Sequence, residues 1–226
     1  MIRKLDWDSA FFNLAVGEWH AGEEASGARV FDVIYAKGSK TDDYSPEGFA
    51  KTFSETKVVF SKQLTTGKHL EERPIREVNE KQVIASLYEL AFESGKHSRF
   101  LLDSRFGKDN FEKLYKTWVD NSLNGQFATK VLVYDEGLKL SGLVTYKINE
   151  GFATIGLIAV SPDRQGHGIG RELLAHVEKE LAENNIFELR IPTQLENEAA
   201  CRFYKKQGYK IIETTQITHY WKNDTV

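Results

Sequence analysis

Residues 160–170 read Val160-Ser161-Pro162-Asp163-Arg164-Gln165-Gly166-His167-Gly168-Ile169-Gly170. An apolar, strand-like run precedes this segment, and apolar residues follow it at helical spacing, at Ile169, Leu173, Val177 and Leu181. The glycines let the backbone curl so that several N–H groups point to one spot, without a Cβ atom in the way. The helix N-terminus adds unpaired N–H groups and about half a positive charge. The segment therefore predicts a strand–loop–helix unit that cradles an anion, with a diphosphate as its natural ligand.

Two other glycine-rich phosphate loops fit this segment less well. The Rossmann fingerprint places its glycines near the start of a βαβ unit, with an acidic residue about 20 positions later. Here the strands before the loop form a meander instead. A Walker A loop needs Lys-Ser or Lys-Thr after its last glycine, and neither follows Gly170. A glycine turn at a helix start with no ligand remains as the simplest alternative.

Regular elements are predicted on both sides of the loop. Upstream, short turns with Gly137 and Gly151 join three strand-like runs into an antiparallel meander: Thr129–Tyr134, Leu140–Ile148 and Phe152–Val160. Before them, apolar stripes predict one helix through residues 83–91, with a cap at Asn79 and Gln82, and another through residues 111–119. Downstream, the pattern predicts a strand, a short helix that ends at Gly208 and two last strands: Phe187–Ile191, Asn197–Gln207, Lys210–Glu213 and Gln216–Trp221.

Length and charge distribution predict two parts. The chain has 226 residues, and a typical domain of about 150 leaves room for a smaller partner. Residues 1–72 carry 9 basic and 12 acidic side chains, whereas residues 73–226 carry 21 of each. The polar stretch from Leu70 to Pro74 resembles a connector, since Pro74 disfavours a helix at Arg73. We therefore expect a small N-terminal α+β domain over 1–72, with strands near 14–19, 29–35 and 57–62, and a main domain over 73–226.

Composition excludes several classes of function. The net charge of −3 and the pI of about 6.1 provide no broad basic surface for nucleic acid. The apolar run Leu157–Val160 is too short to span a bilayer, and we expect no membrane association. No apolar stretch follows the charged residues near the N-terminus, which argues against a secretory signal. Cys201 is the single cysteine, so no intrachain disulfide can form, and a reducing, cytoplasmic location is expected.

Two signatures resemble one enzyme superfamily. The run from Gln165 to Gly170 resembles the Q/R-x-x-G-x-G/A motif of the GCN5-related N-acetyltransferases. About thirty residues later, the stretch from Asn197 to Tyr209 is similar to the second signature, which has Asn, Ala, Tyr and then Gly with an aromatic residue. The resemblance covers roughly residues 73–226. It implies a mixed α+β fold (the GNAT fold), with a mostly antiparallel, twisted central sheet flanked by helices.

Shorter motifs extend the resemblance to one family within that superfamily. The segment Leu5–Phe12, the triplet Ser98–Phe100, the run Tyr115–Trp118 and the pair Thr193-Gln194 are similar to the dTDP-fucosamine acetyltransferases. Those enzymes acetylate the 4-amino group of a nucleotide-linked deoxysugar, and they have a smaller N-terminal domain. The resemblance thus implies a small-molecule amine acceptor, namely a nucleotide-linked 4-amino-4,6-dideoxysugar.

The superfamily resemblance also implies acetyl-coenzyme A as the donor. Its pyrophosphate would lie on the backbone of Gln165, Gly166, His167, Gly168, Ile169 and Gly170, with Arg171 at the start of the helix. Its pantetheine arm would pair with the strand end Ile158-Ala159-Val160, from which the strand 187–191 would splay away. Asn197 would steady the pantetheine arm. Since Asn is also a favoured helix cap, Asn197 has a structural role open to it as well.

Transfer to an amine would pass through a tetrahedral intermediate and release a thiolate. Tyr204 is the candidate acid for the departing sulfur, because it matches the tyrosine of the superfamily and titrates near 10, so it can donate at neutral pH. A buried tyrosine with no catalytic role is the structural alternative. The general base is not identified, and His97 and His219 are the candidates. The histidines show no metal-type spacing with Cys, Asp or Glu, so no catalytic metal is expected.

The acceptor site is expected between the two domains. Arg99 would pair with acceptor phosphates and Phe100 would stack on the sugar or base, although both also suit a packed loop. Two alternatives remain for the function: an N-acetyltransferase for another small amine or a protein N-terminus, and a catalytically silent acyl-coenzyme A-binding module. Oligomeric state is open, and the strand Gln216–Trp221 is a candidate edge for a homodimer.

Overall fold

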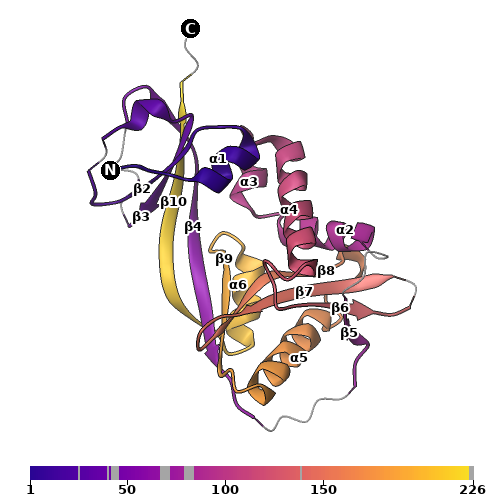
Figure 1. The fold of residues 1–226 in the computed structure, drawn as a ribbon. Helices are drawn as coiled ribbons and strands as arrows, with labels where there is room; N and C mark the ends of the chain where they lie inside the picture. The colour runs from indigo at the N-terminus through magenta and orange to yellow at the C-terminus, as the bar shows by residue number, and fades with distance from the viewer. Residues whose placement is uncertain are drawn as a thin grey trace.

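A computed structural model of the chain describes residues 1–24, 26–39, 41, 46–66, 72–78, 84–137 and 139–223. Within these ranges, ten strands form one sheet in the order β1-β2-β3-β10-β4-β9-β8-β7-β6-β5 (Figure 1). The neighbours are antiparallel except in the pairs β2/β3 and β8/β9. A mostly antiparallel, twisted sheet flanked by helices was predicted, and this α+β fold class is confirmed.

The elements follow the chain in this order. The N-terminal part contains β1 (Arg3–Lys4), α1 (Asp6–Phe12), β2 (Val16–His20), a 3-10 turn (Ala28–Val30), β3 (Val33–Gly38) and β4 (Phe49–Gln63). The middle contains β5 (Ile75–Glu77), α2 (Ile84–Ser94), α3 (Arg99–Leu102), α4 (Gly107–Leu123), β6 (Lys130–Asp135) and β7 (Leu140–Ile148). The last part contains β8 (Ala153–Val160), α5 (Ile169–Glu183), β9 (Glu188–Gln194), α6 (Glu198–Lys206) and β10 (Lys210–Lys222).

The central strands are buried on both faces. Successive side chains of a strand point to opposite sides, so Val131 and Val133 of β6 join one core with α2 and α4, whereas Leu132 and Tyr134 join the other with α5 and α6. Two-sided burial makes these strands continuous apolar runs rather than alternating ones. This is why the meander β6-β7-β8 was predictable from the sequence, and its antiparallel pairing is confirmed.

The long strand pair β4 and β10 corrects the sequence interpretation. Two final strands were expected, but residues 210–222 form one strand that pairs with β4 along almost its whole length. Residues 214–215, where the turn was expected, remain paired with β4, and the register shift lies earlier, between Ile211 and Glu213, where a bulge absorbs an extra residue without ending the pairing. Similarly, β4 extends far beyond the predicted 57–62.

The position of β10 also corrects the prediction that residues 216–221 form an exposed edge. The strand lies between β3 and β4 (Figure 1), so both of its edges are paired within the chain. Residues 216–221 therefore offer no free edge to a second copy. The same strand joins both proposed domains in one sheet, because β3 and β4 precede the expected boundary and β10 follows it. The boundary at residue 72 stays a prediction.

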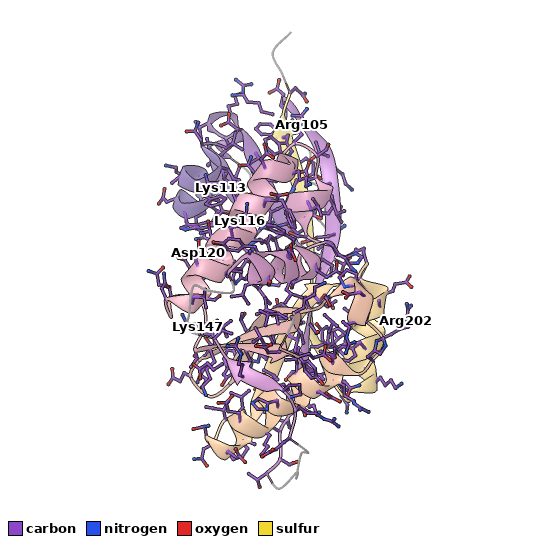
Figure 2. All side chains as sticks on the ribbon, turned by 90° about the vertical axis from the view of Figure 1, so that its right-hand side faces the viewer. Arg105, Lys113, Lys116, Asp120, Lys147 and Arg202 are labelled. Atoms are coloured by element: carbon purple, nitrogen blue, oxygen red, sulfur yellow. The ribbon has the colours of Figure 1, made fainter. Side chains whose placement is uncertain are left out.

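Two sequence expectations fall partly outside the described residues. The predicted cap at Asn79 and Gln82 lies there, as do Leu70 and Glu71 of the predicted connector. The described part of the first predicted helix begins at Ile84, and the second helix, α4, has the expected amphipathic character. Figure 2 shows Lys113, Lys116 and Asp120 along its outer side, while Phe111, Leu114, Tyr115 and Val119 are buried. Among the described residues, no helix is long and apolar enough to cross a membrane.

Candidate active site

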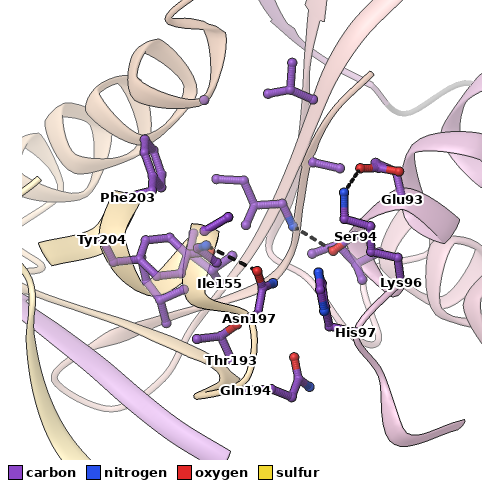
Figure 3. A pocket seen from close by; sticks show the side chains of 18 of the residues that line it. Glu93, Ser94, Lys96, His97, Ile155, Thr193, Gln194, Asn197, Phe203 and Tyr204 are labelled. Atoms are coloured by element: carbon purple, nitrogen blue, oxygen red, sulfur yellow. Dashed lines mark hydrogen bonds and ion pairs between the residues drawn. The ribbon is translucent and has the colours of Figure 1, made fainter. Parts of the chain in front are cut away.

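A cavity of about 1130 Å³ brings the two signatures together. Its walls are the glycine loop, the second halves of β8 and β9, α6, and residues from β4, α2 and α3. Figure 3 shows Phe203 and Tyr204 on one side of this space and Ser94, Lys96 and His97 on the other. The cavity extends from the glycine loop, which α2 contacts through Glu93, to Glu55 of β4 and Arg99 of α3.

The cavity exists because two neighbouring strands diverge. Strands β8 and β9 pair only at Ala153 with Leu189 and at Thr154 with Arg190, and the rest of β8 has no partner on that side. Two side chains form hydrogen bonds with backbone groups on or beside this free edge. Ser94 Oγ accepts a hydrogen bond from the Ile158 N–H at 3.3 Å, and Gln165 Nε2 donates to the Val160 carbonyl at 3.2 Å. The splay expected from the resemblance is present in the fold.

The glycine loop has the backbone of an open anion cradle. Gly166 and Gly168 have φ angles of 82° and 88°, in the left-handed region that other residues rarely adopt. A Cβ atom at position 166 would meet nothing within 4 Å, so the space above the loop is open. Gly168 is the N-cap of α5 and no side chain caps that helix, which leaves the first-turn N–H groups to an external acceptor.

Side chains around the loop hold its shape. His167 Nδ1 lies 3.0 Å from the Gln165 carbonyl and 3.2 Å from the Arg164 carbonyl, so this nitrogen must carry the proton and donate. Arg164 pairs with Glu136, and Gln165 Nε2 also donates to Glu93 at 2.9 Å. The loop is thus fastened to its surroundings while its backbone faces the cavity. These residues fit the paired phosphates of a coenzyme A-type donor.

Helix α6 contributes the residues of the second signature. Asn197 caps it, since its side chain accepts from the Ala200 N–H at 3.2 Å, and the structural role considered from the sequence is confirmed. Asn197 also lines the cavity. Tyr204 is 5% exposed and its ring packs against Phe60 at 5.4 Å. Burial raises the pKa of Tyr204 above its ordinary value, so its phenol stays protonated and can only donate a proton.

The other end of the cavity contains an unexpected carboxylate. Glu55 of β4 is 6% exposed, and its Oε2 has no hydrogen-bond partner among the described residues. Burial raises the pKa of Glu55 to about 7, an effect that the nearby Arg99 partly offsets. The other carboxylate on the cavity wall, Glu93, is engaged by Lys96 and Gln165. Glu55 is therefore the cavity carboxylate with a free oxygen, and it titrates near neutral pH.

Arg99, the first residue of α3, lies close to Glu55 of β4. Its guanidinium group stacks over the rings of Tyr35 and Phe100, at 4.3 Å and 4.6 Å from their centroids. Among the described residues no carboxylate forms an ion pair with it. Lys57 also lines the cavity and lies near Glu55, whereas Lys37 is paired with Glu18 and Lys96 with Glu93, the carboxylate that also holds Gln165. Arg99 and Lys57 are therefore the cations beside Glu55 that form no ion pair with a described carboxylate.

All fourteen predicted site residues line this one cavity: Arg99, Phe100, Ile158, Ala159, Val160, Gln165, Gly166, His167, Gly168, Ile169, Gly170, Arg171, Asn197 and Tyr204. Of the two candidate bases, His97 lines the cavity, whereas His219 is fully buried behind its wall and donates to Asp103. Sequence reasoning missed Glu55. The sequence showed only an acidic residue near a predicted strand. Because that strand was predicted to start at residue 57, nothing in the sequence was a reason to place Glu55 in a site. Nowhere in the described ranges do three or more His, Cys, Asp or Glu side chains gather as metal ligands.

A family comparison decides the relationship. The sequence model of the acetyltransferase (GNAT) family matches residues 82–209. The chain belongs to the GNAT acetyltransferase family. The spore coat polysaccharide biosynthesis protein SpsD of Bacillus subtilis (strain 168) is 26% identical over 136 residues, which are 60% of this chain and 47% of SpsD. The chain thus matches about half the length of that relative.

Solved structures share the GNAT fold. A conserved protein of unknown function from Staphylococcus epidermidis ATCC 12228 matches with a TM-score of 0.60 and 16% identity, over 86% of this chain and 74% of that one. The PaiA N-acetyltransferase of Thermoplasma acidophilum, in complex with coenzyme A, matches with a TM-score of 0.50 and 22% identity, over 64% of this chain and 97% of that one. At these identities the likeness concerns the fold alone.

Proposed function

We propose that the protein transfers the acetyl group of acetyl-coenzyme A to the amino group of a nucleotide-linked 4-amino-4,6-dideoxysugar. The observation that carries this proposal is the cavity itself. One end is a cradle of backbone N–H groups, and the other places Arg99 and Lys57 beside Glu55, whose Oε2 has no hydrogen-bond partner among the described residues. A donor with paired phosphates suits the first end. An acceptor that carries both a diphosphate and an amine suits the second.

The donor would be held by main-chain groups. The N–H groups of Gly166 to Gly170, together with the positive end of α5, would bind the pyrophosphate. The unpaired edge of β8 would receive the pantetheine arm as an additional strand, after Ser94 and Gln165 release the groups they occupy. The thioester would then lie in the splay between β8 and β9, beside Tyr204.

The charges at this second end favour an anionic acceptor. Arg99 and Lys57 lie beside Glu55 and form no ion pair with a described carboxylate, so a polycation such as a polyamine would meet like charges. A nucleotide sugar carries two phosphates that these groups can bind, and its protonated amine needs one anion. Glu55 supplies that anion. The name of SpsD, a polysaccharide biosynthesis protein, is in keeping with an acceptor made of sugar.

We assign the two proton transfers to two residues on the cavity wall. Glu55 accepts one proton from the acceptor's ammonium group, directly or through one water, and passes it to solvent. The free amine attacks the thioester carbonyl carbon, and the C–S bond breaks as the amide forms. Tyr204 gives a proton to the departing thiolate and is reprotonated by the second proton that the nitrogen loses. In total, one ammonium group and one thioester are converted into one amide, one thiol and one released proton.

The test is a thiol-release assay with acetyl-coenzyme A and a panel of amines. The panel contains dTDP- and UDP-linked 4-amino sugars, the free 4-amino sugar, spermidine and a peptide with a free N-terminus. We expect the largest kcat/KM with a nucleotide-linked amino sugar. A larger kcat/KM with spermidine or with the peptide would replace the acceptor that we propose. Binding of acetyl-coenzyme A without turnover of any amine would favour a silent binding module.

A further inference from the structure

Behind the acceptor end lies a buried polar network that the proposed chemistry does not use. Asp103, in the loop after α3, has a side chain that is 1% exposed. Its Oδ2 accepts hydrogen bonds from His219 Nδ1 at 2.7 Å and from Trp221 Nε1 at 2.9 Å, both on β10. Thr52 Oγ1 on β4 adds a third donor at 3.2 Å. The network thus joins three elements that are far apart in the sequence.

The contacts of His219 fix its tautomer from both sides. Asp103 is an acceptor, so His219 Nδ1 must carry the hydrogen. On the other side of the ring, His219 Nε2 lies 3.4 Å from Arg99 Nη1, and a guanidinium group can only donate. His219 Nε2 must therefore present its lone pair to Arg99. Burial lowers the pKa of His219 to about 4, in agreement with a neutral ring.

Arg99 is consequently held on three sides. His219 accepts one of its N–H groups, and the rings of Tyr35 and Phe100 lie against its guanidinium group. His219 in turn packs on Tyr35, at 4.8 Å between ring centroids, and on Phe106 at 5.5 Å. The remaining N–H groups have no carboxylate partner among the described residues, while the side chain lines the cavity. A cation fixed in this way binds an anion without first losing side-chain entropy.

We propose that Asp103 and His219 are positioning residues that hold Arg99 as a preorganised receptor for a phosphate group of the acceptor. The assignment of that phosphate to the acceptor rests on the proposed function. The positioning itself rests on the buried contacts. Arg99 would touch the phosphate, whereas His219 and Asp103 act through Arg99 and touch no substrate. Because the phosphate is remote from the reacting amine, the network should affect KM for the acceptor much more than kcat.

Two substitutions of His219 separate its two contacts. In His219→Gln the side chain reaches as far as the ring Nε2, so an amide oxygen can still accept from Arg99. In His219→Asn the side chain reaches only as far as Nδ1, so it can donate to Asp103 but leaves Arg99 without its acceptor. His176→Asn, on α5 and away from the cavity, is the matched control. We expect His219→Asn to raise KM for a dTDP-linked amino sugar about tenfold or more, while His219→Gln retains most of the wild-type value.

A comparison of acceptors distinguishes positioning from damage to the fold. The discrimination ratio is kcat/KM for the dTDP-linked amino sugar divided by kcat/KM for the free amino sugar. We expect this ratio to fall about tenfold in His219→Asn and to stay within twofold of wild type in His176→Asn. A variant that is merely misfolded loses both activities together and keeps the ratio. An unchanged ratio in His219→Asn, with or without lower activity, would overturn the positioning role.

A binding measurement keeps the inference testable if the acceptor is a different molecule. With coenzyme A at saturation, so that the glycine loop is occupied, inorganic pyrophosphate is titrated into wild type, His219→Asn and His219→Gln. Wild-type binding that weakens about tenfold in His219→Asn and less in His219→Gln supports the inference, even where no dTDP-linked sugar is acetylated. Equal affinities, or no wild-type binding, would contradict it. Failure of the proposed function and failure of the positioning role thus give different results.

Discussion

The two ends of the cavity are built in different ways. At the loop end, the groups that face the ligand are backbone N–H groups from one continuous segment, Gln165 to Gly170. At the acceptor end, the groups are side chains from β4, α3 and β10, brought together by the sheet: Glu55, Arg99 and, behind them, His219. The first construction depends on local conformation, and the second depends on the topology of the whole chain. The loop end should therefore depend on the backbone conformation that its glycines allow, whereas the acceptor end should depend on individual side-chain atoms.

The largest effect is expected at the acceptor end, from Glu55→Gln. The substitution removes the proton acceptor, and kcat/KM should fall by about a hundredfold to ten-thousandfold. In wild type, Glu55 must be ionised to act, so kcat/KM should rise with pH and reach half of its limit near pH 7. This rise of kcat/KM with pH should be absent from the residual activity of Glu55→Gln. A pH series of initial rates checks both statements.

Glu213→Gln is the control for that substitution, since Glu213 is an exposed residue of β10 outside the cavity wall. Its kcat/KM should match wild type at every pH. If Glu55→Gln keeps both the wild-type kcat/KM and its rise with pH, another group takes the proton. His97, which lines the same cavity, then becomes the next candidate.

Removal of the Tyr204 hydroxyl group should have the next largest effect. We expect Tyr204→Phe to lower kcat by about tenfold to a thousandfold, because the thiolate then leaves without an acid. Tyr209→Phe is the matched control, since Tyr209 binds Glu178 and does not line the cavity. Single-turnover rates check the chemical step. Equal rates for Tyr204→Phe and wild type would exclude Tyr204 as the acid.

The loop end is tested by a glycine pair with similar backbone angles. Gly168 and Gly151 have φ angles of 88° and 79°, so an alanine at either position is strained by a similar amount. Only position 168 lies at the cavity. Gly168→Ala should weaken coenzyme A binding about tenfold, whereas Gly151→Ala should leave it unchanged. Equal losses in the two variants would mean that the loop acts through stability and not through contact with phosphate.

The remaining effect concerns stability, not activity. Burial raises the pKa of Glu55 from 4.5 to about 7, so the folded state binds this proton more tightly than the unfolded chain does. The associated stabilisation is complete below about pH 4.5 and is lost as the pH rises through 7. Glu55→Gln should therefore raise the unfolding free energy at pH 8 by about 3 kcal/mol, roughly 6–12 °C in Tm, with a much smaller change at pH 5. Thermal melts at both pH values check the sign, and a lower Tm at pH 8 would contradict it.

The same contrast explains what the sequence could reveal. The loop and the α6 signature were predicted residue by residue, because positive φ angles, helix starts and apolar periodicity are local properties. Arg99 was suggested only by a short resemblance, and Glu55 was missed, because its role depends on which strands flank β4. The interior position of β10 was mispredicted for a related reason. The two predicted strands, 210–213 and 216–221, left residues 214–215 unpaired, but pairing with β4 continues through them.

The central claim is that the loop end of this cavity binds a coenzyme A thioester. Calorimetric titration of the folded protein with acetyl-coenzyme A tests it most directly. The account predicts saturable binding of one molecule per chain, competed by free coenzyme A. An absence of binding heat at several temperatures, with protein whose folding has been verified, would contradict it.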